Sequence, residues 1–168
     1  MPLTKIKSLG ITDGTIVNAD ISASAAIAGT KISGSFGKVL QVVTATDTTS
    51  RTSTSATLAA NSNTLSVSIT PSSVSSKIFV VVTTVAGQDT VSRSAKFALY
   101  RDSTSINYFQ CNDTSDKLYY PLCISNLDSP ATTSAITYQL YFATDGVGTN
   151  TINYATSKGS ITAFEIGA

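Results

Sequence analysis

The chain has 168 residues, of which 42% are hydrophobic and only 12% charged, and its formal net charge is +1. The charged share is about half of that in an average soluble domain. Because the basic residues are scattered singly, no basic patch predicts binding to nucleic acid or to an anionic membrane. The length predicts one domain of moderate size plus an arm.

Targeting and membrane segments are not predicted. The start of the chain, MPLTKIKSLGITDG, has no continuous apolar region of the kind found in secretory signals. The longest apolar run, Ile78 to Val82, is far too short to cross a bilayer. The abundance of Ser and Thr is typical of β-rich extracellular proteins and virion surface proteins.

The first predicted element is an extended, repeatedly bent arm over residues 1–35. Neither a helix nor a strand has the period of its isoleucines, and Asp13-Gly14, Asn18 and Gly29 supply turns between them. The isoleucines are spaced by five, five, six and five residues: Ile11, Ile16, Ile21, Ile27 and Ile32.

This arm cannot order by itself. Fixing one residue's backbone costs about 1–2 kcal/mol, whereas one buried isoleucine in every five or six residues returns only about 1.5–3 kcal/mol. We therefore expect the isoleucines to mediate oligomerisation or anchoring, with the arm lying against other chains that bury them.

The segment GITDGTIVNADISASAAIAGTKISG resembles segments of tail-fibre and other appendage proteins of tailed bacteriophages, especially those that infect marine and cyanobacterial hosts. The resemblance is close over residues 9–34, and the Ser/Thr-rich chain that follows resembles such proteins only in its general texture. It implies a virion structural protein that forms a homotrimer and contacts other phage virion proteins.

Residues 36–168 are predicted to form a β-sandwich domain of about nine strands, without a convincing helix. A polar connection over residues 46–55 could itself be partly extended. We expect the strands at residues 38–44, 64–70, 77–86, 96–101, 105–111, 118–125, 134–143, 151–155 and 160–166.

Individual strands carry more specific signals. Residues 64–70 alternate, with Leu65, Val67 and Ile69 on one face. Residues 77–86 are β-branched almost throughout, which predicts a central strand buried on both faces. Gly87 is predicted to begin a turn, residues 95–111 to form a hairpin, and Pro121 to confine its strand to an edge or a bulge.

The predicted fold class is therefore all-β, an extended arm followed by a jelly-roll-like sandwich. An immunoglobulin-type sandwich is the second choice. It is disfavoured because the chain has no Trp and because Cys111 and Cys123 are only twelve residues apart. A disulfide between these cysteines is geometrically feasible, but reduced thiols are favoured for a protein assembled in a bacterial cytoplasm.

Catalytic residues are nearly absent. The chain has no histidine and a single glutamate, Glu165, which we expect on an exposed face or in an inter-subunit ion pair. No nucleophile, phosphate-loop or metal-ligand motif occurs, so the chain is predicted to be no enzyme and to use no cofactor. Asn112, Asp113 and Asp116 could hold calcium, although a solvated loop is the favoured interpretation.

Surface recognition is assigned to loops at the ends of the sandwich and to tyrosines. Tyrosines supply flat amphipathic surface suited to sugars and proteins, although they are also ordinary core and interface residues. Loops at residues 102–105, 112–117 and 144–150 are expected to cluster at the sandwich ends. The candidate recognition residues are Asn112, Asp113, Asp116, Tyr119, Asp145 and Asn150.

The sequence favours a short tail fibre or fibre-tip component that attaches to a glycan or protein of the host surface. A capsid decoration or cement protein, with an arm that stitches neighbouring capsid subunits, is the main alternative. A carbohydrate-binding module without catalysis is the second. The predicted location is the virion, at the tail or on the capsid surface, after assembly in the host cytoplasm.

Overall fold

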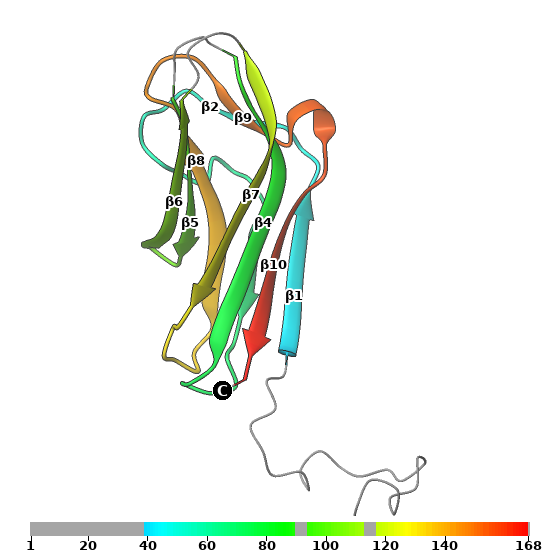
Figure 1. Ribbon diagram of the computed structural model, residues 1–168, viewed down its shortest axis with the longest axis vertical. Coiled ribbons are helices and arrows are strands. Elements are labelled where there is room, and N and C mark those ends of the chain that lie inside the picture. Colours follow the sequence, from blue (N-terminus) through cyan, green and yellow to red (C-terminus); the bar gives the residue numbers. More distant parts are fainter. Residues whose placement is uncertain (1–38, 90–93, 113–116, 168) are drawn as a thin grey trace, which may run out of the picture. The chain divides into compact units, whose positions relative to one another are not determined.

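The computed structural model describes residues 39–89, 94–112 and 117–167. The predicted arm with its five isoleucines lies outside the described residues, as do Asp113 and Asp116 and with them the candidate calcium site. The described part is a sandwich of two antiparallel β-sheets, drawn as two layers in Figure 1. The predicted all-β sandwich is confirmed at this level.

The described residues form ten strands, divided between sheet A and sheet B. Sheet A contains β1 (Val39–Asp47), β2 (Arg51–Ser53), β4 (Lys77–Gln88), β7 (Leu118–Asp128), β9 (Asn150–Ile152) and β10 (Gly159–Ile166). Sheet B contains β3 (Ser66–Ile69), β5 (Ser94–Arg101), β6 (Thr104–Asn112) and β8 (Ile136–Ala143). One turn of 3-10 helix, η4 (Tyr154–Thr156), lies between β9 and β10.

The long strand β4 organises sheet A. Along one edge it pairs with β7, and along the other it pairs first with β10 and then with β9. β1 pairs with β10 and β2 with β9, so β1 and β2 together form the outer strand on that side. In sheet B the order is β3-β8-β5-β6.

The strand pairs are nested along the chain. β1 pairs with β10, β3 with β8, β4 with β7, and β5 with β6, all antiparallel. Successive pairs alternate between sheet A and sheet B. Strands of the first half of the sandwich therefore pair with strands of the second half in reverse chain order.

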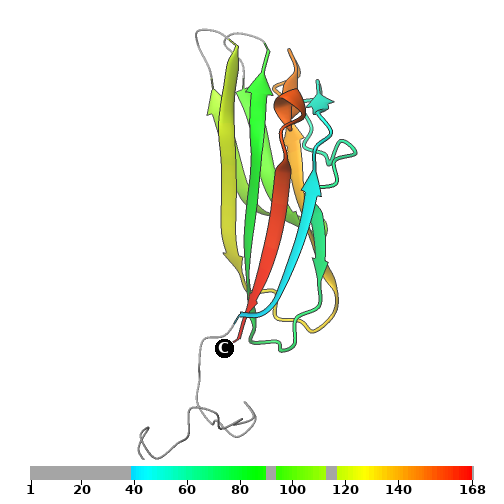
Figure 2. The ribbon, with the colours of Figure 1, turned by 90° about the vertical axis from the view of Figure 1, so that its right-hand side faces the viewer.

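The strand registers define two ends of the sandwich. At the entry end, Ile166 of β10 pairs with both Val39 and Lys77. At the opposite end, called the loop end here, Gln88 of β4 pairs with Leu118 and Asn150. The start of β1 and the C-terminal end of β10 lie at the same end in Figure 1 and Figure 2.

The core lies between the two sheets and follows the alternation of the strands. Tyr138, Phe97 and Phe142 of sheet B are among its largest fully buried side chains, and they face Val80 and Ile161 of sheet A. Burying side chains of this size contributes about 1.5–3 kcal/mol each. This packing holds the two sheets together.

Several predicted strands are confirmed. Leu65, Val67 and Ile69 are all buried at alternate positions along β3 and the residue before it. β5 and β6 form the predicted hairpin, with Asp102 at a positive φ of 51° in its two-residue turn. β7 pairs only with β4, so Pro121 stands in an edge strand, as predicted.

The prediction that β4 is buried on both faces is wrong. Ile78, Val80 and Val82 are fully buried, whereas Phe79 and Val81 point to the outward face and are only half-buried. A two-layer sandwich covers one face of each sheet, so apolar residues on the other face need a different explanation.

Several strand limits also differ from the prediction, most clearly at β4 and β9. Gly87 belongs to β4 and not to a turn. The strand predicted at residues 151–155 ends at Ile152, because Asn153 and Ala155 both adopt φ 52° and η4 follows. Left-handed backbone of this kind cannot continue a β-ladder.

The prediction for Glu165 is wrong as well. Its side chain is fully buried on the inward side of β10, so it is neither exposed nor in an inter-subunit ion pair. Its carboxylate accepts hydrogen bonds from the Ser72 backbone N–H (2.7 Å), the Ser72 hydroxyl (2.6 Å) and Gln41 Nε2 (2.6 Å). These hydrogen bonds offset the free-energy cost of burying the charge.

Candidate recognition surface

The loop end of sheet A carries two exposed, stacked tyrosines. Tyr119, near the start of β7, is 41% exposed, and Tyr154, in η4, is 38% exposed. Their ring centroids lie 3.9 Å apart and the ring planes are inclined by 27°. We call these two residues the tyrosine pair.

Gly87 explains why the ring of Tyr119 lies where it does. The two residues are paired across β4 and β7. A Cβ atom at Gly87 would overlap Cδ1 and Cε1 of Tyr119, so the ring covers the bare glycine backbone. Glycine inside a strand commonly marks such a close approach. Gly87 is therefore the sequence signal for this site, although a glycine between two apolar runs also predicts a turn.

The tyrosine pair offers flat apolar area together with two hydroxyl groups. A hydrogen bond to Tyr154, together with burial and the negative charge of Asp89, raises the pKa of Tyr119, so its phenol stays neutral at physiological pH. Tyrosine rings suit the faces of sugar rings and apolar protein side chains, and their neutral hydroxyl groups can donate and accept hydrogen bonds. The pair is thus a chemically plausible contact site that is open to solvent.

Sheet B presents a second group of aromatic and polar side chains on its outward face. Tyr100 of β5 and Tyr141 of β8 are stacked, with ring centroids 4.0 Å apart. Beside them Tyr108 is 51% exposed and donates a hydrogen bond to Gln110. Gln110 in turn donates to Asn112 Oδ1 (2.9 Å). This face is therefore polar between its tyrosines.

The predicted recognition residues are distributed unevenly. Asn112, at the end of β6 in sheet B, is exposed and also accepts a hydrogen bond from Ser94 Oγ (2.7 Å). Tyr119, in sheet A, is exposed as expected. Asp145 is half-buried, and its Oδ1 accepts from the backbone N–H of Val147 (3.1 Å), so the side chain holds its own loop.

Asn150 is not a surface residue, which corrects its prediction. Its side chain is fully buried, and Nδ2 donates to the carbonyl of Ala143 (2.8 Å). Asn150 is the first residue of β9, in which side chains alternate between the two faces of the sheet. Its side chain points inward, whereas that of Thr151 points outward. A polar residue next to a glycine-rich loop looked like loop surface in the sequence, but β9 draws it into the sandwich.

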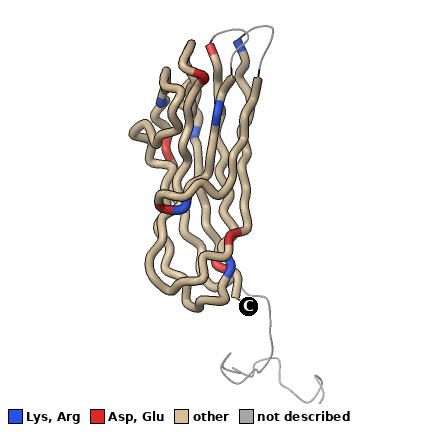
Figure 3. The backbone as a smooth tube through the Cα atoms, turned by 90° about the vertical axis from the view of Figure 1, so that its left-hand side faces the viewer, with Lys and Arg blue, Asp and Glu red and all other residues tan. Residues whose placement is uncertain are grey.

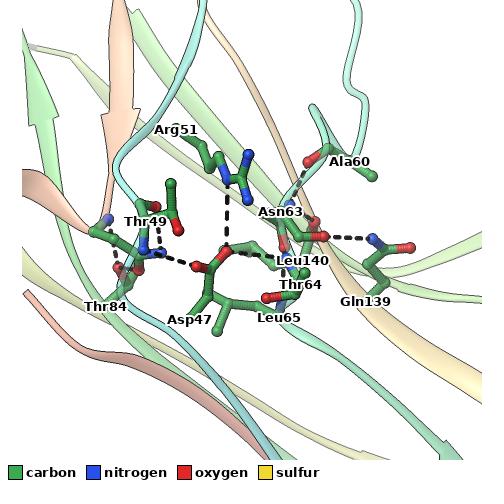
Figure 4. Close-up of polar contacts among 11 residues, drawn as sticks. Asp47, Thr49, Arg51, Ala60, Asn63, Thr64, Leu65, Thr84, Gln139 and Leu140 are labelled. Carbon is green, nitrogen blue, oxygen red and sulfur yellow. Dashed lines mark hydrogen bonds and ion pairs between the residues drawn. The ribbon is translucent and has the colours of Figure 1, made fainter. Parts of the chain in front are cut away.

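The sequence did not predict a buried polar cluster around Asp47 and Asn63 (Figure 4). Asp47 accepts hydrogen bonds from the backbone N–H groups of Thr49 (2.8 Å) and Thr64 (3.1 Å), and Arg51 Nε lies 3.7 Å from its Oδ2. Burial alone would raise the pKa of Asp47, but these hydrogen bonds and Arg51 lower it. The carboxylate is ionised and already saturated.

Asn153 completes this cluster. Its Nδ2 donates to the carbonyl of Thr49 (3.0 Å), while its Oδ1 accepts from Thr84 Oγ1 (2.8 Å). Asn63 plays the same role nearby, since its Nδ2 donates to the carbonyl of Leu140 (2.9 Å). The partners are mostly backbone groups of irregular segments, so the cluster fixes the connections around β2 and β9 and offers no reactive group to a substrate.

The described residues hold few groups suited to other kinds of site. In these ranges no group of three or more His, Cys, Asp or Glu side chains could hold a metal ion. Both cysteines are free: Cys111 is half-buried in β6 and Cys123 is exposed in β7. Charged residues are sparse and spread along the described chain in Figure 3. Within the same ranges no helix has the length and apolarity of a membrane span.

Comparison with known proteins does not assign the chain to a family. No protein-family model matches it, and no curated protein shows significant similarity to it.

Proposed function

We propose that the chain is a structural protein of a bacteriophage virion, a short tail fibre or fibre-tip component. It assembles as a homotrimer through the arm of residues 1–35 and displays its β-sandwich for attachment to the host. The observation that carries the proposal is the isoleucine repeat of residues 9–34, which resembles phage appendage segments and directly precedes an antiparallel sandwich.

The strand order supports a jelly roll as the finer fold. β2 continues the outer strand begun by β1, and β9 continues the position of β10 beside β4. Counted in this way, the sandwich has eight strand positions, four in each sheet. A jelly roll consists of eight strands in two Greek keys. The nested pairing of β1 with β10, β3 with β8, β4 with β7 and β5 with β6 fits this winding.

The two ends of the sandwich support a display role. The chain enters the sandwich at Val39, at the entry end, whereas the tyrosine pair lies at the loop end. β4 spans twelve residues between these ends, which corresponds to about 40 Å at the rise of a strand. The tyrosine pair therefore lies at the end of the sandwich opposite to the point where the chain enters it.

The proposed ligand of the tyrosine pair is a glycan or a protein of the host surface. The proposal involves no catalysis, no cofactor, no nucleic acid and no membrane. Assembly takes place in the host cytoplasm, a reducing compartment in which Cys111 and Cys123 persist as thiols.

The test is to locate the protein on intact particles. An antibody raised against residues 38–168 is applied to virions and viewed by electron microscopy. We expect label at the tail. Label over the icosahedral shell would instead make the chain a capsid decoration protein, and virions without label, next to a positive control for a known virion protein, would overturn the proposal.

A further inference from the structure

The outward face of sheet A carries an apolar row that crosses four neighbouring strands. Val42 of β1 pairs with Phe164 of β10, Phe164 pairs with Phe79 of β4, and Phe79 pairs with Leu127 of β7. Residues paired in this way are neighbours on one face of the sheet. Figure 2 shows the four strands side by side, with β1 in cyan, β10 in red and β4 in green.

These side chains are open to solvent in the single chain. Val42 is 54% exposed and Leu127 is 52% exposed, while Phe79 and Phe164 between them are half-buried with ring centroids 6.3 Å apart. Toward the entry end the row continues into Val39, Leu40 and Ile166. We call the four residues of the row together with these three the apolar face.

The outward faces of the two sheets differ in composition. At the outward positions of β1, β4, β7 and β10 the only charged side chain is Lys77, at the margin of the apolar face. The outward face of sheet B instead carries Tyr108, Gln110 and Asn112, which are joined by hydrogen bonds. Single exposed apolar residues need no explanation, but a contiguous group of them marks an interaction site.

The position of the apolar face identifies its occupant. Val39, the first described residue, belongs to this face, and 38 residues precede it in the chain. If the isoleucine arms of several copies assemble together, as the proposed function requires, the starts of their β1 strands are brought close to one another. The apolar face begins where these strands begin, so a neighbouring copy is the partner that assembly through the arm brings within its reach.

We infer that the apolar face packs against the sandwich of a neighbouring copy of this chain, and that the assembled protein buries Val42, Phe79, Phe164 and Leu127 between subunits. This inference rests on the proposed assembly through the arm. It also explains why β4 is apolar on both faces, since one face fills the core and the other fills the subunit contact. The polar face of sheet B then stays free for other partners, while the tyrosine pair lies at the loop end of sheet A, away from the row.

The test uses the full chain with a photo-reactive amino acid at position 127, and with the same amino acid at position 108 as the control. We expect the residue at 127 to cross-link to residues 39–42, 79, 127, 164 or 166 of another copy, identified by mass spectrometry of mixed isotope-labelled and unlabelled protein. The residue at 108 should give no such product. Cross-links from 127 to residues 1–38, or none between copies of an intact oligomer, would overturn the inference.

A second measurement distinguishes assembly through the arm from packing of the apolar face. In the double variant V42N/L127N, association of the full chain in sedimentation velocity should shift to at least tenfold higher concentration. The control is Y108N/V147N, which changes two comparably exposed side chains away from this face, and its association should not shift. An unchanged V42N/L127N oligomer would contradict the packing while leaving arm-driven assembly intact, whereas a monomeric wild type at every concentration would contradict both.

Discussion

At the scale of single residues, Glu165 shows how a buried charge becomes part of the framework. It joins β10 to the segment after β3 through Ser72, and to β1 through Gln41, whose Nε2 also donates to the carbonyl of Thr70 (2.7 Å). Burial alone would raise the pKa of Glu165, but the hydrogen bonds outweigh burial and lower the pKa to about 2. The carboxylate is thus held ionised inside the sandwich.

The first prediction concerns Glu165→Gln and its pH dependence. Folding lowers the pKa from 4.5 to about 2, so the stabilisation is fully present above about pH 4.5 and is lost as the pH falls toward 2. We expect E165Q to lower the free energy of unfolding at pH 7 by about 1–3 kcal/mol. Its stability should fall less than that of the wild type between pH 4.5 and 2, measured by urea unfolding.

Equal acid sensitivity in E165Q and the wild type would contradict this role. The pKa of Asp47 is also lowered, so Asp47 contributes to the loss of stability at low pH in both proteins. Its contribution cancels when the two are compared.

A second prediction compares two glycines that are equally crowded. A Cβ at Gly159 would overlap Oδ1 of the buried Asn153, whereas a Cβ at Gly87 would overlap the exposed ring of Tyr119. Gly159→Ala must displace a saturated buried side chain, so we expect a loss of about 1–3 kcal/mol in unfolding free energy. Gly87→Ala can be accommodated by rotation of Tyr119 and should cost less than about 1 kcal/mol.

The readouts for these variants differ. Chemical denaturation measures the loss in G159A. In G87A the tyrosine pair should separate, with a changed near-ultraviolet circular dichroism spectrum and reduced binding to host cells. A G87A protein with the wild-type spectrum would mean that Tyr119 does not depend on the glycine.

At the scale of elements, the two sheets are tied together near the end of β7. Asp128 of β7 accepts two hydrogen bonds from Arg101 Nη1 of β5 (2.8 and 2.9 Å) and one from the hydroxyl of Tyr138 of β8 (2.7 Å). Burial and the neighbouring Asp128 raise the pKa of Tyr138 well above its ordinary value. The edge strand of sheet A is thereby fastened to the centre of sheet B.

The third prediction removes the acceptor of this tie. Asp128→Ala should lower the free energy of unfolding by about 2–4 kcal/mol, because Arg101 and the buried Tyr138 hydroxyl both lose their partner. The control Tyr138→Phe keeps the pair of Asp128 with Arg101 and should cost only about 0.5–1.5 kcal/mol. Urea unfolding measures both, and a D128A variant as stable as Y138F would argue against the three-residue tie.

The sequence was most informative about the positions of individual strands. The alternation of Leu65, Val67 and Ile69 located β3, and Pro121 identified an edge strand, because both signals act within one strand. The same local information failed for the outward half of β4. Whether Phe79 and Val81 are covered depends on a second layer or a second molecule, and neither is encoded in the strand's own period.

At the scale of the whole molecule, the arm and the sandwich have separate tasks in the proposed function. The described residues already contain a core closed between two sheets. The fourth prediction is that deletion of residues 1–34 leaves a soluble sandwich that no longer enters particles, measured by immunoblotting purified virions from phage carrying the deletion. Normal incorporation of the truncated protein would show that the arm has no assembly role.

The sequence alone determined the all-β character, most strand positions, the scarcity of catalytic groups and the isoleucine repeat, because these follow from composition and from periods within short segments. Only the tertiary structure decided that Glu165 and Asn150 are buried, that Gly87 lies beneath Tyr119, and that Val42, Phe164, Phe79 and Leu127 form one row. Each of these features joins residues far apart in the chain. Their register is set by pairing between strands, which no local pattern specifies.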